Sequence, residues 1–159
     1  MATYEGNVGI SQLRAKIKQK SKLLVGESAE KVAIHLIDNS VIGAPFYNVK
    51  GGESVENDQG DFKNSWQVGL GDVDRTIREA DPSGSAAIAN AIVKGKAYDM
   101  QEKVYITNNV AHAELVEEGW DDNPVFGWQA KDGYHLVRDS EPTVTAILQA
   151  VANKVSKIS

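Results

Sequence analysis

The sequence predicts an α+β fold: a small, mostly antiparallel sheet packed by a long or kinked N-terminal helix, a short central helix and a C-terminal helix. Two observations predict this class. Apolar residues recur at helical spacing near both ends of the chain, and short runs of strand-favouring residues lie between them. A chain of 159 residues has the length of one domain and can fold without cross-links, so we expect residues 1–159 to form a single domain.

Two apolar stripes predict the N-terminal helix. The first occupies one narrow arc of a helix over residues 11 to 25, with Ser11 as the N-cap, and its members are Ile10, Leu13, Ile17 and Leu24. The second stripe points roughly 140° away around the helix, and its members are Ala29, Val32, Ala33, Leu36 and Ile37. Either the helix breaks or kinks near Gly26, or one long helix contacts different neighbours with its two halves. The second alternative would suit a subunit in a ring.

Two strands are predicted in the middle of the chain. Residues 65–70 alternate, and one face of this strand carries Trp66, Val68 and Leu70. Val104 to Thr107 alternate in the same way. This second strand is predicted to stop at Asn108-Asn109, because two adjacent amides suit a turn and compete with ladder hydrogen bonds. Residues 73–80 are ambiguous and could continue the first strand.

A helix of small residues is predicted between the two strands. The turn Asp81-Pro82-Ser83-Gly84 leads into it, and Ser83 or Ser85 is expected to cap it. The helix should run through Val93 and end at Gly95. Its small side chains permit a close approach to the sheet.

Three further elements are predicted in the last third of the chain. A short helix should follow the Asn108-Asn109 corner and end at Gly119. Residues 134–138 are expected to form a last strand. Ser140-Glu141-Pro142 then begins a final helix, with proline tolerated in the first turn. The apolar stripe of this helix is Val144, Ile147, Leu148, Val151 and Val155.

Composition argues against several classes of protein. The formal charge is −5, from 17 basic and 22 acidic residues, whereas nucleic-acid-binding domains usually carry a basic excess. The absence of cysteine excludes disulfides and thiolate metal sites. No apolar run reaches the roughly 18 residues that a membrane helix needs, and residues 1–9 are too polar for a signal peptide. We therefore expect no membrane partner.

The residues that could carry chemistry lack the spacing that the chemistry needs. His35, His112 and His135 are in no metal-binding motif, and no serine lies in Gly-x-Ser-x-Gly. A polar loop lacks the alternating oxygen ligands and terminal glutamate of a calcium loop, although it contains Glu56, Asn57, Asp58 and Asp61. We expect no catalytic residue, no cofactor and no metal.

Two blocks of residues resemble a known family. The first block is Gly60, Phe62, Ser65 and Trp66, and the second is Tyr105, Ile106, Asn108, Asn109, Ala113, Glu117 and Gly119, followed by Pro124 and Gly127. In this order they resemble the bacteriophage neck proteins, the head–tail joining or tail-completion family. The chain departs from the family pattern at His112, where the family often has an aromatic residue, in the approach from Val55 to Gly60, and after Gly127, where it is longer and more charged.

The resemblance implies a structural virion protein and not an enzyme. Such a subunit forms a closed homo-oligomeric ring, a hexamer or dodecamer, in the connector complex of the phage neck. A portal, adaptor or head-completion protein would lie on one face, and a tail tube, terminator or sheath protein on the other. DNA would pass through the bore without sequence-specific binding, helped by like-charge repulsion from an acidic lining. The protein would be made in the bacterial host cytoplasm and would reside in the virion.

Several features are candidates for subunit contacts. Trp120, Phe126 and Trp128, in the loop over residues 120–131, either bury area at an interface or cover the end of the core. The polar loop over residues 47–61 is a second candidate. Glu117 is expected to anchor the Asn108-Asn109 corner or a neighbouring subunit. A basic run is either a solvated helix end or a contact with DNA or an acidic portal surface, and it comprises Arg14, Lys16, Lys18, Lys20 and Lys22.

Two alternative functions stay open. The nearer one is a tail terminator ring that caps the tail tube. The other is a small hydrolase that uses Glu117, Asp121 or His112 as acid or base, since Glu117-Glu118 and Asp121-Asp122 form an acidic cluster. An enzyme would need convergent polar groups in a concave pocket.

Overall fold

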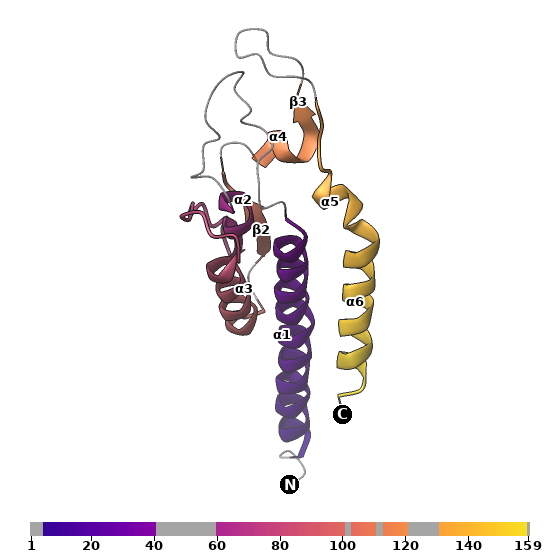
Figure 1. The fold of residues 1–159 in the computed structure, drawn as a ribbon. Helices are drawn as coiled ribbons and strands as arrows, with labels where there is room; N and C mark the ends of the chain where they lie inside the picture. Colours follow the sequence, from indigo (N-terminus) through magenta and orange to yellow (C-terminus); the bar gives the residue numbers. More distant parts are fainter. Residues whose placement is uncertain (1–4, 41–59, 101–102, 111–112, 121–130, 159) are drawn as a thin grey trace, which may run out of the picture.

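The long helix α1 (Glu5–Asn39) is the axis of the molecule, with α3 (Ser85–Ala97) along one side and α6 (Glu141–Ser156) along another (Figure 1). The computed structural model describes residues 5–40, 60–100, 103–110, 113–120 and 131–158. Helix α1 continues through residue 26 without a break, so the alternative of one long helix is confirmed. The predicted N-cap at Ser11 is wrong, because the helix starts at Glu5 and Ser11 lies inside it. None of the described helices is long and apolar enough to cross a bilayer.

A contact between two glycines explains how α1 and α3 pack. A Cβ atom at Gly26 would collide with the carbonyl oxygen of Gly95, and a Cβ atom at Gly95 would lie 2.7 Å from the carbonyl oxygen of Gly26. Both helices therefore need glycine at this crossing. The expectation that Gly95 ends α3 is wrong: the helix continues to Ala97, because Gly95 serves close packing here and not chain termination.

The N-terminus of α3 is capped by an aspartate. Gly84 occupies the N-cap position with a left-handed backbone, φ 66°. The carboxylate of Asp81 accepts hydrogen bonds from the hydroxyl groups of Ser83 and Ser85, both at 2.7 Å, and from their backbone N–H groups. The predicted N-cap at Ser83 or Ser85 is wrong, because Gly84 holds that position, although the Ser83 hydroxyl accepts the backbone N–H of Ser85 at 3.2 Å.

The main sheet has two antiparallel strands, β1 (Trp66–Leu70) and β2 (Val104–Asn108), with Val68 opposite Ile106. The α+β prediction is thus confirmed, although both faces of β1 are covered. Gln67 is fully buried and donates a hydrogen bond to the carbonyl of Thr76 at 3.2 Å. Residues 73–81 therefore run beside β1 as irregular chain and do not form a strand.

The hydrophobic core lies between the second half of α1, the main sheet and α3. Leu36 and Ile37 pack in a cluster with Phe62, Trp66 and Val116. A second cluster joins α1 to β1 and α3 through Ala29, Ala33, Val68 and Ala91. The second apolar stripe of α1 therefore faces the core, as its phase predicts. Helix α2 (Asp61–Asn64), which contains Phe62, leads directly into β1.

The C-terminal part wraps back onto α1. Helix α4 (Ala113–Glu118) ends directly before Gly119, one residue earlier than predicted, and β3 (Gly119–Trp120) pairs with β4 (Lys131–Asp132). The strand predicted over residues 134–138 is wrong. The backbone of His135 is left-handed, φ 48°, and it interrupts extended structure before the short helix α5 (Leu136–Asp139). Helix α6 then has Pro142 in its first turn, as predicted.

Candidate assembly surface

The two blocks that resemble the phage neck family meet in space. The side-chain amide of Asn108 donates a hydrogen bond to the carbonyl of Phe62 at 2.7 Å. The same side chain accepts a bond from the backbone N–H of Val110 at 3.3 Å, which turns the chain at the end of β2. Asn109 donates to the carbonyl of Asp74 at 2.6 Å. The predicted Asn-Asn corner is therefore a joint between the second block and the chain on either side of β1.

The first block is anchored on the end of α1. The indole N–H of Trp66 donates to the hydroxyl of Ser40 at 2.8 Å, and this hydroxyl donates to the carbonyl of Leu36 at 2.7 Å. Phe62 and Trp66 pack edge to face, with ring centroids 5.8 Å apart. Gly60 begins the block with φ 93°, where a Cβ atom would collide with Pro82. These contacts stabilise the fold, so the residues of the first block are not candidates for the surface that contacts a partner.

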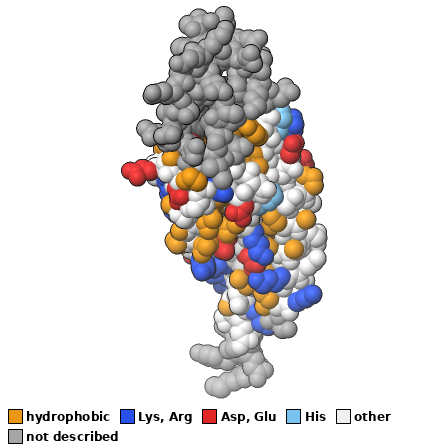
Figure 2. All heavy atoms as spheres, viewed as in Figure 1, with side chains coloured by type: hydrophobic (Ala, Val, Ile, Leu, Met, Phe, Trp, Pro, Cys, Tyr) orange, Lys and Arg blue, Asp and Glu red, His pale blue; other side chains and the backbone are white. Residues whose placement is uncertain are grey.

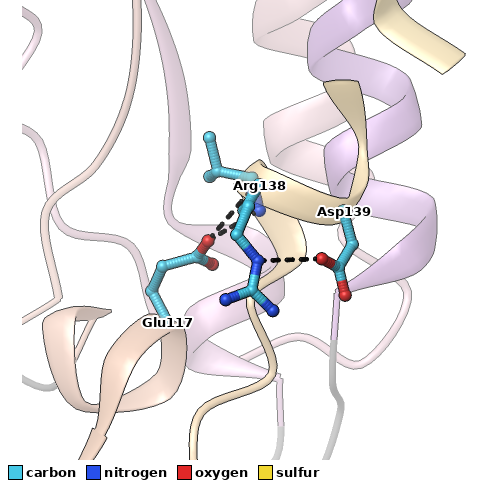
Figure 3. Close-up of polar contacts among 4 residues, drawn as sticks. Glu117, Arg138 and Asp139 are labelled. Carbon is cyan, nitrogen blue, oxygen red and sulfur yellow. Dashed lines mark hydrogen bonds and ion pairs between the residues drawn. The ribbon is translucent and has the colours of Figure 1, made fainter. Parts of the chain in front are cut away.

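Glu117 is a structural residue of the C-terminal region. One of its carboxylate oxygens, Oε1, accepts the backbone N–H groups of Val137 at 2.9 Å and Arg138 at 3.3 Å (Figure 3). The guanidinium of Arg138 points to Asp139 and pairs with it. Glu117 therefore anchors α5, and no hydrogen bond among the described residues joins it to the Asn108-Asn109 corner. The first part of the prediction for Glu117 is wrong, because the chain reversal after β4 brings α5 to its carboxylate.

Several predicted residues lie outside the described part of the chain. They are His112, Asp121, Asp122, Pro124, Phe126, Gly127 and Trp128, together with most of the loop over residues 47–61. The backbone of Trp120 belongs to β3, but its side chain is also outside the description. The two loop interfaces and the acidic cluster with Asp121 therefore stay predictions.

His35 lies where α1 meets α6. Its Nε2 is 3.2 Å from the hydroxyl of Ser140, and its Nδ1 is 3.1 Å from the amide of Asn39. This placement agrees with a residue at the boundary of the helix packing. Within the described residues, no group of three or more histidine, aspartate or glutamate side chains could hold a metal ion.

The N-terminal part of α1 extends past the ends of α3 and α6 (Figure 1). Residues 9–19 are all exposed, and we call this segment the arm. The apolar stripe predicted here is uncovered: Ile10, Leu13 and Ile17 are 52%, 58% and 50% exposed. We call Ile10, Leu13 and Ile17 the arm stripe. Apolar side chains repeated along one side of an exposed helix are typical of a surface that contacts a partner.

The basic run is divided between the two flanks of the arm stripe. In Figure 2 most of the visible Lys and Arg side chains lie in the lower part of the coloured surface. Lys18 pairs with Asp99 at 3.0 Å, and its hydrogen bond and charge lower the pKa of Asp99. Both side chains are more than half exposed, so this pair adds little to stability.

A groove lies farther along α1 than the arm, between α1, β2 and α6. It has a volume of about 580 Å³ and is lined mainly by apolar side chains, Leu24, Val25, Ala29, Val32, Val104, Ile106, Leu148 and Ala152, with Ser28, Thr145 and Gln149 as its polar members. The hydroxyl of Ser28 is buried and has no hydrogen-bond partner among the described residues. This lining offers a surface for apolar binding and few groups for acid–base chemistry.

An ion pair joins α1 to α6. Glu27 accepts hydrogen bonds from Lys154 at 2.7 Å and from Lys31, and these bonds lower the pKa of Glu27. Because Lys154 belongs to α6 and Glu27 to α1, the pair connects the two helices. The Lys154 side chain is 62% exposed, so the pair adds little to stability.

Sequence reasoning found the arm stripe but missed the groove. Val104 and Ile106 were expected in a strand, and Leu148 in the stripe of α6, yet no pattern within one segment indicates that these residues leave a hollow between them. The stripe of α6 gives one indication of the groove. The described part of the chain does not cover all five of its residues, and Leu148 stays 45% exposed.

Comparison with known proteins identifies no relative: neither protein-family models, nor curated proteins, nor solved structures match the chain.

Proposed function

We propose that this chain is a structural subunit of the neck of a tailed bacteriophage, where copies of it form a closed ring that joins the DNA-filled head to the tail. The observation that carries the proposal is the uncovered arm stripe, together with an apolar groove on the same chain. A protein that works by assembly needs such surfaces, whereas an acid–base enzyme needs convergent polar groups.

The two blocks that resemble the phage neck family also support the proposal. They resemble the neck proteins in sequence, and in this fold they form one joint in which Asn108 bonds to Phe62. The residues of the resemblance are thus used to hold the fold.

A ring of one kind of chain requires a contact between two different patches of the subunit, repeated until the rotation closes. One rim of the ring would face the portal, adaptor or head-completion protein, and the other would face the tail. The excess of acidic residues over basic ones, 22 against 17, would let DNA pass through the bore without adhering.

Electron microscopy of phage particles made from a genome with an early stop codon in this gene tests the proposal. Full heads and complete tails that lie unattached are the expected result. Tails that are absent or of uncontrolled length would instead identify a tail terminator. Normal, infectious particles would contradict both roles.

A further inference from the structure

The hydrogen bonds of the main sheet show which backbone groups of β2 point away from β1. In an antiparallel pair, residues alternate between positions that bond to the partner strand and positions whose backbone groups point outward. The N–H of Val68 donates to the side chain of Asn90 at 2.8 Å, so it points away from β2. Because Val68 lies opposite Ile106, the N–H and carbonyl groups of Ile106 point away from β1.

Val104 has the same orientation as Ile106. The two residues are one full period of a strand apart, about 7 Å along it. The next bond of the ladder agrees with this alternation, since the N–H of Gly71 donates to the carbonyl of Lys103 at 2.8 Å. Within the described part of the chain, no hydrogen bond reaches the outward backbone groups of Val104 and Ile106. Such an open strand edge is a template for pairing with another extended segment.

The apolar groove follows this open edge. Val104 and Ile106 line it on the side of β2, Leu148 lines it on the side of α6, and α1 completes it. None of the described residues that line the groove is charged. Ser28, on the side of α1, is 7% exposed, and its hydroxyl lacks a partner among the described residues. A segment in the groove would therefore meet unpaired backbone groups on one side and apolar side chains on the others.

The open edge favours a single extended segment over other occupants. A helix uses its backbone groups internally, so a helix in the groove would leave the groups of Val104 and Ile106 unpaired. The β2 strand of a second copy lies beside its own α6, and two such strands could not meet edge to edge without displacing both α6 helices. An extended segment can pair with the edge and also fill the groove.

We propose that β2 accepts an extended segment of another polypeptide as a third strand, with alternate side chains of that segment in the apolar groove. Backbone hydrogen bonds to Val104 and Ile106 would supply affinity, and the uncharged lining would select apolar residues at every second position. This inference goes beyond the proposed function. It concerns a single copy, so it can fail or hold independently of the ring and of the stop-codon phage.

Hydrogen–deuterium exchange of the free chain, followed by NMR, tests whether the edge is open. The amide of Ile106 should exchange at least about tenfold faster than the amide of Tyr105, which lies opposite Gly69 and points towards β1. Equal protection of the two amides in a dilute sample would show that the edge is already covered, and it would overturn the inference. Protection of Ile106 that rises with protein concentration would show that a second copy occupies the edge, and it would also overturn the inference.

Synthetic peptides test the binding itself. Four hexapeptides alternate threonine with valine, isoleucine, leucine or phenylalanine, and each is titrated into the 15N-labelled full chain. We expect at least one of them to shift the amide signals of Val104 and Ile106 and to slow the exchange of Ile106. N-methylation of the threonines and N-methylation of the apolar residues block opposite edges of the peptide, so one set should abolish binding and the other should preserve it. Equal effects of the two sets, or no binding by any hexapeptide, would overturn the inference.

A substitution on α6 tests the role of the groove. Leu148→Lys should weaken peptide binding by about tenfold or more, because an apolar side chain in the groove would have to cover the new charge. Val93→Lys is the matched control, since Val93 is an exposed aliphatic residue on α3 outside the groove lining, and it should leave binding unchanged. Circular dichroism and thermal unfolding check that both variants are folded. An unchanged dissociation constant in folded Leu148→Lys would contradict the inference.

Discussion

At the scale of single residues, amide and carboxylate side chains that bond to backbone groups shape this protein. Asn108, Asn109 and Glu117 each bond to the main chain of a segment distant in sequence. A short side chain that satisfies a backbone group holds the chain path firmly, because an unpaired polar group inside a protein costs free energy. The sequence pattern identifies these residues as candidates for such bonds, but only the fold shows which backbone groups they bond to.

Asn108→Val is expected to destabilise the protein by about 1–3 kcal/mol, because the carbonyl of Phe62 loses its hydrogen bond and valine cannot replace it. Urea unfolding measures the change. Thr107→Val is the matched control in the same strand. The hydroxyl of Thr107 donates one longer hydrogen bond, 3.3 Å, to the carbonyl of Asp74, and Asn109 also donates to this carbonyl. A loss below about 0.5 kcal/mol for Asn108→Val would show that the corner matters less than its geometry suggests.

The cap of α3 should make stability depend on pH in the acid range. Hydrogen bonds from Ser83 and Ser85 lower the pKa of Asp81 from 3.8 to about 2. The lowered pKa means that the cap contributes stability above pH 3.8 and loses it as the pH falls through about 2. Asp81→Asn should therefore lower the Tm near neutral pH, and its difference from the natural protein should shrink between pH 3.8 and 2.

The exposed Asp38, near the end of α1, provides the control for this pH dependence. Asp38→Asn should give an unfolding temperature that follows the natural protein across the same range. If the Asp81→Asn difference is constant from neutral pH down to pH 2, the charge of Asp81 does not contribute to the cap.

At the scale of elements, the sequence predicts helices better than their ends. The periodic stripes of α1 and α6 indicate long helices correctly, because burial on one side imposes the same spacing everywhere along a helix. Ends depend on neighbours: Gly95 reads as a stop signal but lies at a helix crossing, and Ser11 reads as a cap but lies inside α1. Tertiary contacts decide such cases.

The strand predicted over residues 134–138 failed for a related reason. The N–H groups of Tyr134 and His135 bond to the carbonyls of Val116 and Glu117 at the end of α4, at 2.8 and 3.0 Å. Their alternating pattern resembles a strand, but their partner is a helix end. The same holds for the candidate assembly surface. The sequence pattern predicts the arm stripe, whereas the groove appears only when three elements are placed together.

Replacing glycine by alanine should have opposite effects on stability at Gly26, where α1 crosses α3, and at Gly9. Gly26→Ala should destabilise the protein by roughly 1–3 kcal/mol, because the added methyl group collides with the carbonyl of Gly95 and forces the helices apart. Gly9→Ala is the control: a Cβ atom there meets nothing within 4 Å. Alanine favours helix over glycine by up to about 1 kcal/mol, so Gly9→Ala should be neutral or stabilising. Thermal unfolding distinguishes the two, and equal effects would show that the crossing tolerates a methyl group.

At the scale of the whole molecule, charge is distributed unevenly along the chain. The basic N-terminal half of α1 extends from a body with an acidic excess. A contact between copies that brings the basic arm against acidic residues should weaken with salt, because the Debye length falls from about 10 Å at 0.1 M to about 3 Å at 1 M.

Sedimentation equilibrium at increasing NaCl concentration measures this dependence. We expect the dissociation constant for self-association to rise as salt screens the opposite charges. Lys20→Gln should reduce the slope, and Lys157→Gln, at the exposed end of α6, should change it less. Association that strengthens steadily with salt would indicate that apolar contacts act against net repulsion, as they would between two arms.

Because α1 is unbroken, the arm moves together with the body as one rigid helix. A helix of 35 residues is about 52 Å long, and the packing of Gly26 against Gly95 removes the place where it could most easily hinge. A tilt of about 10° in the body would therefore move the tip of an arm some 20 Å away by roughly 3–4 Å. In the proposed ring, small rotations of one subunit would thus become displacements of several ångströms at the tip of its arm, enough to shift a contact with a neighbouring subunit.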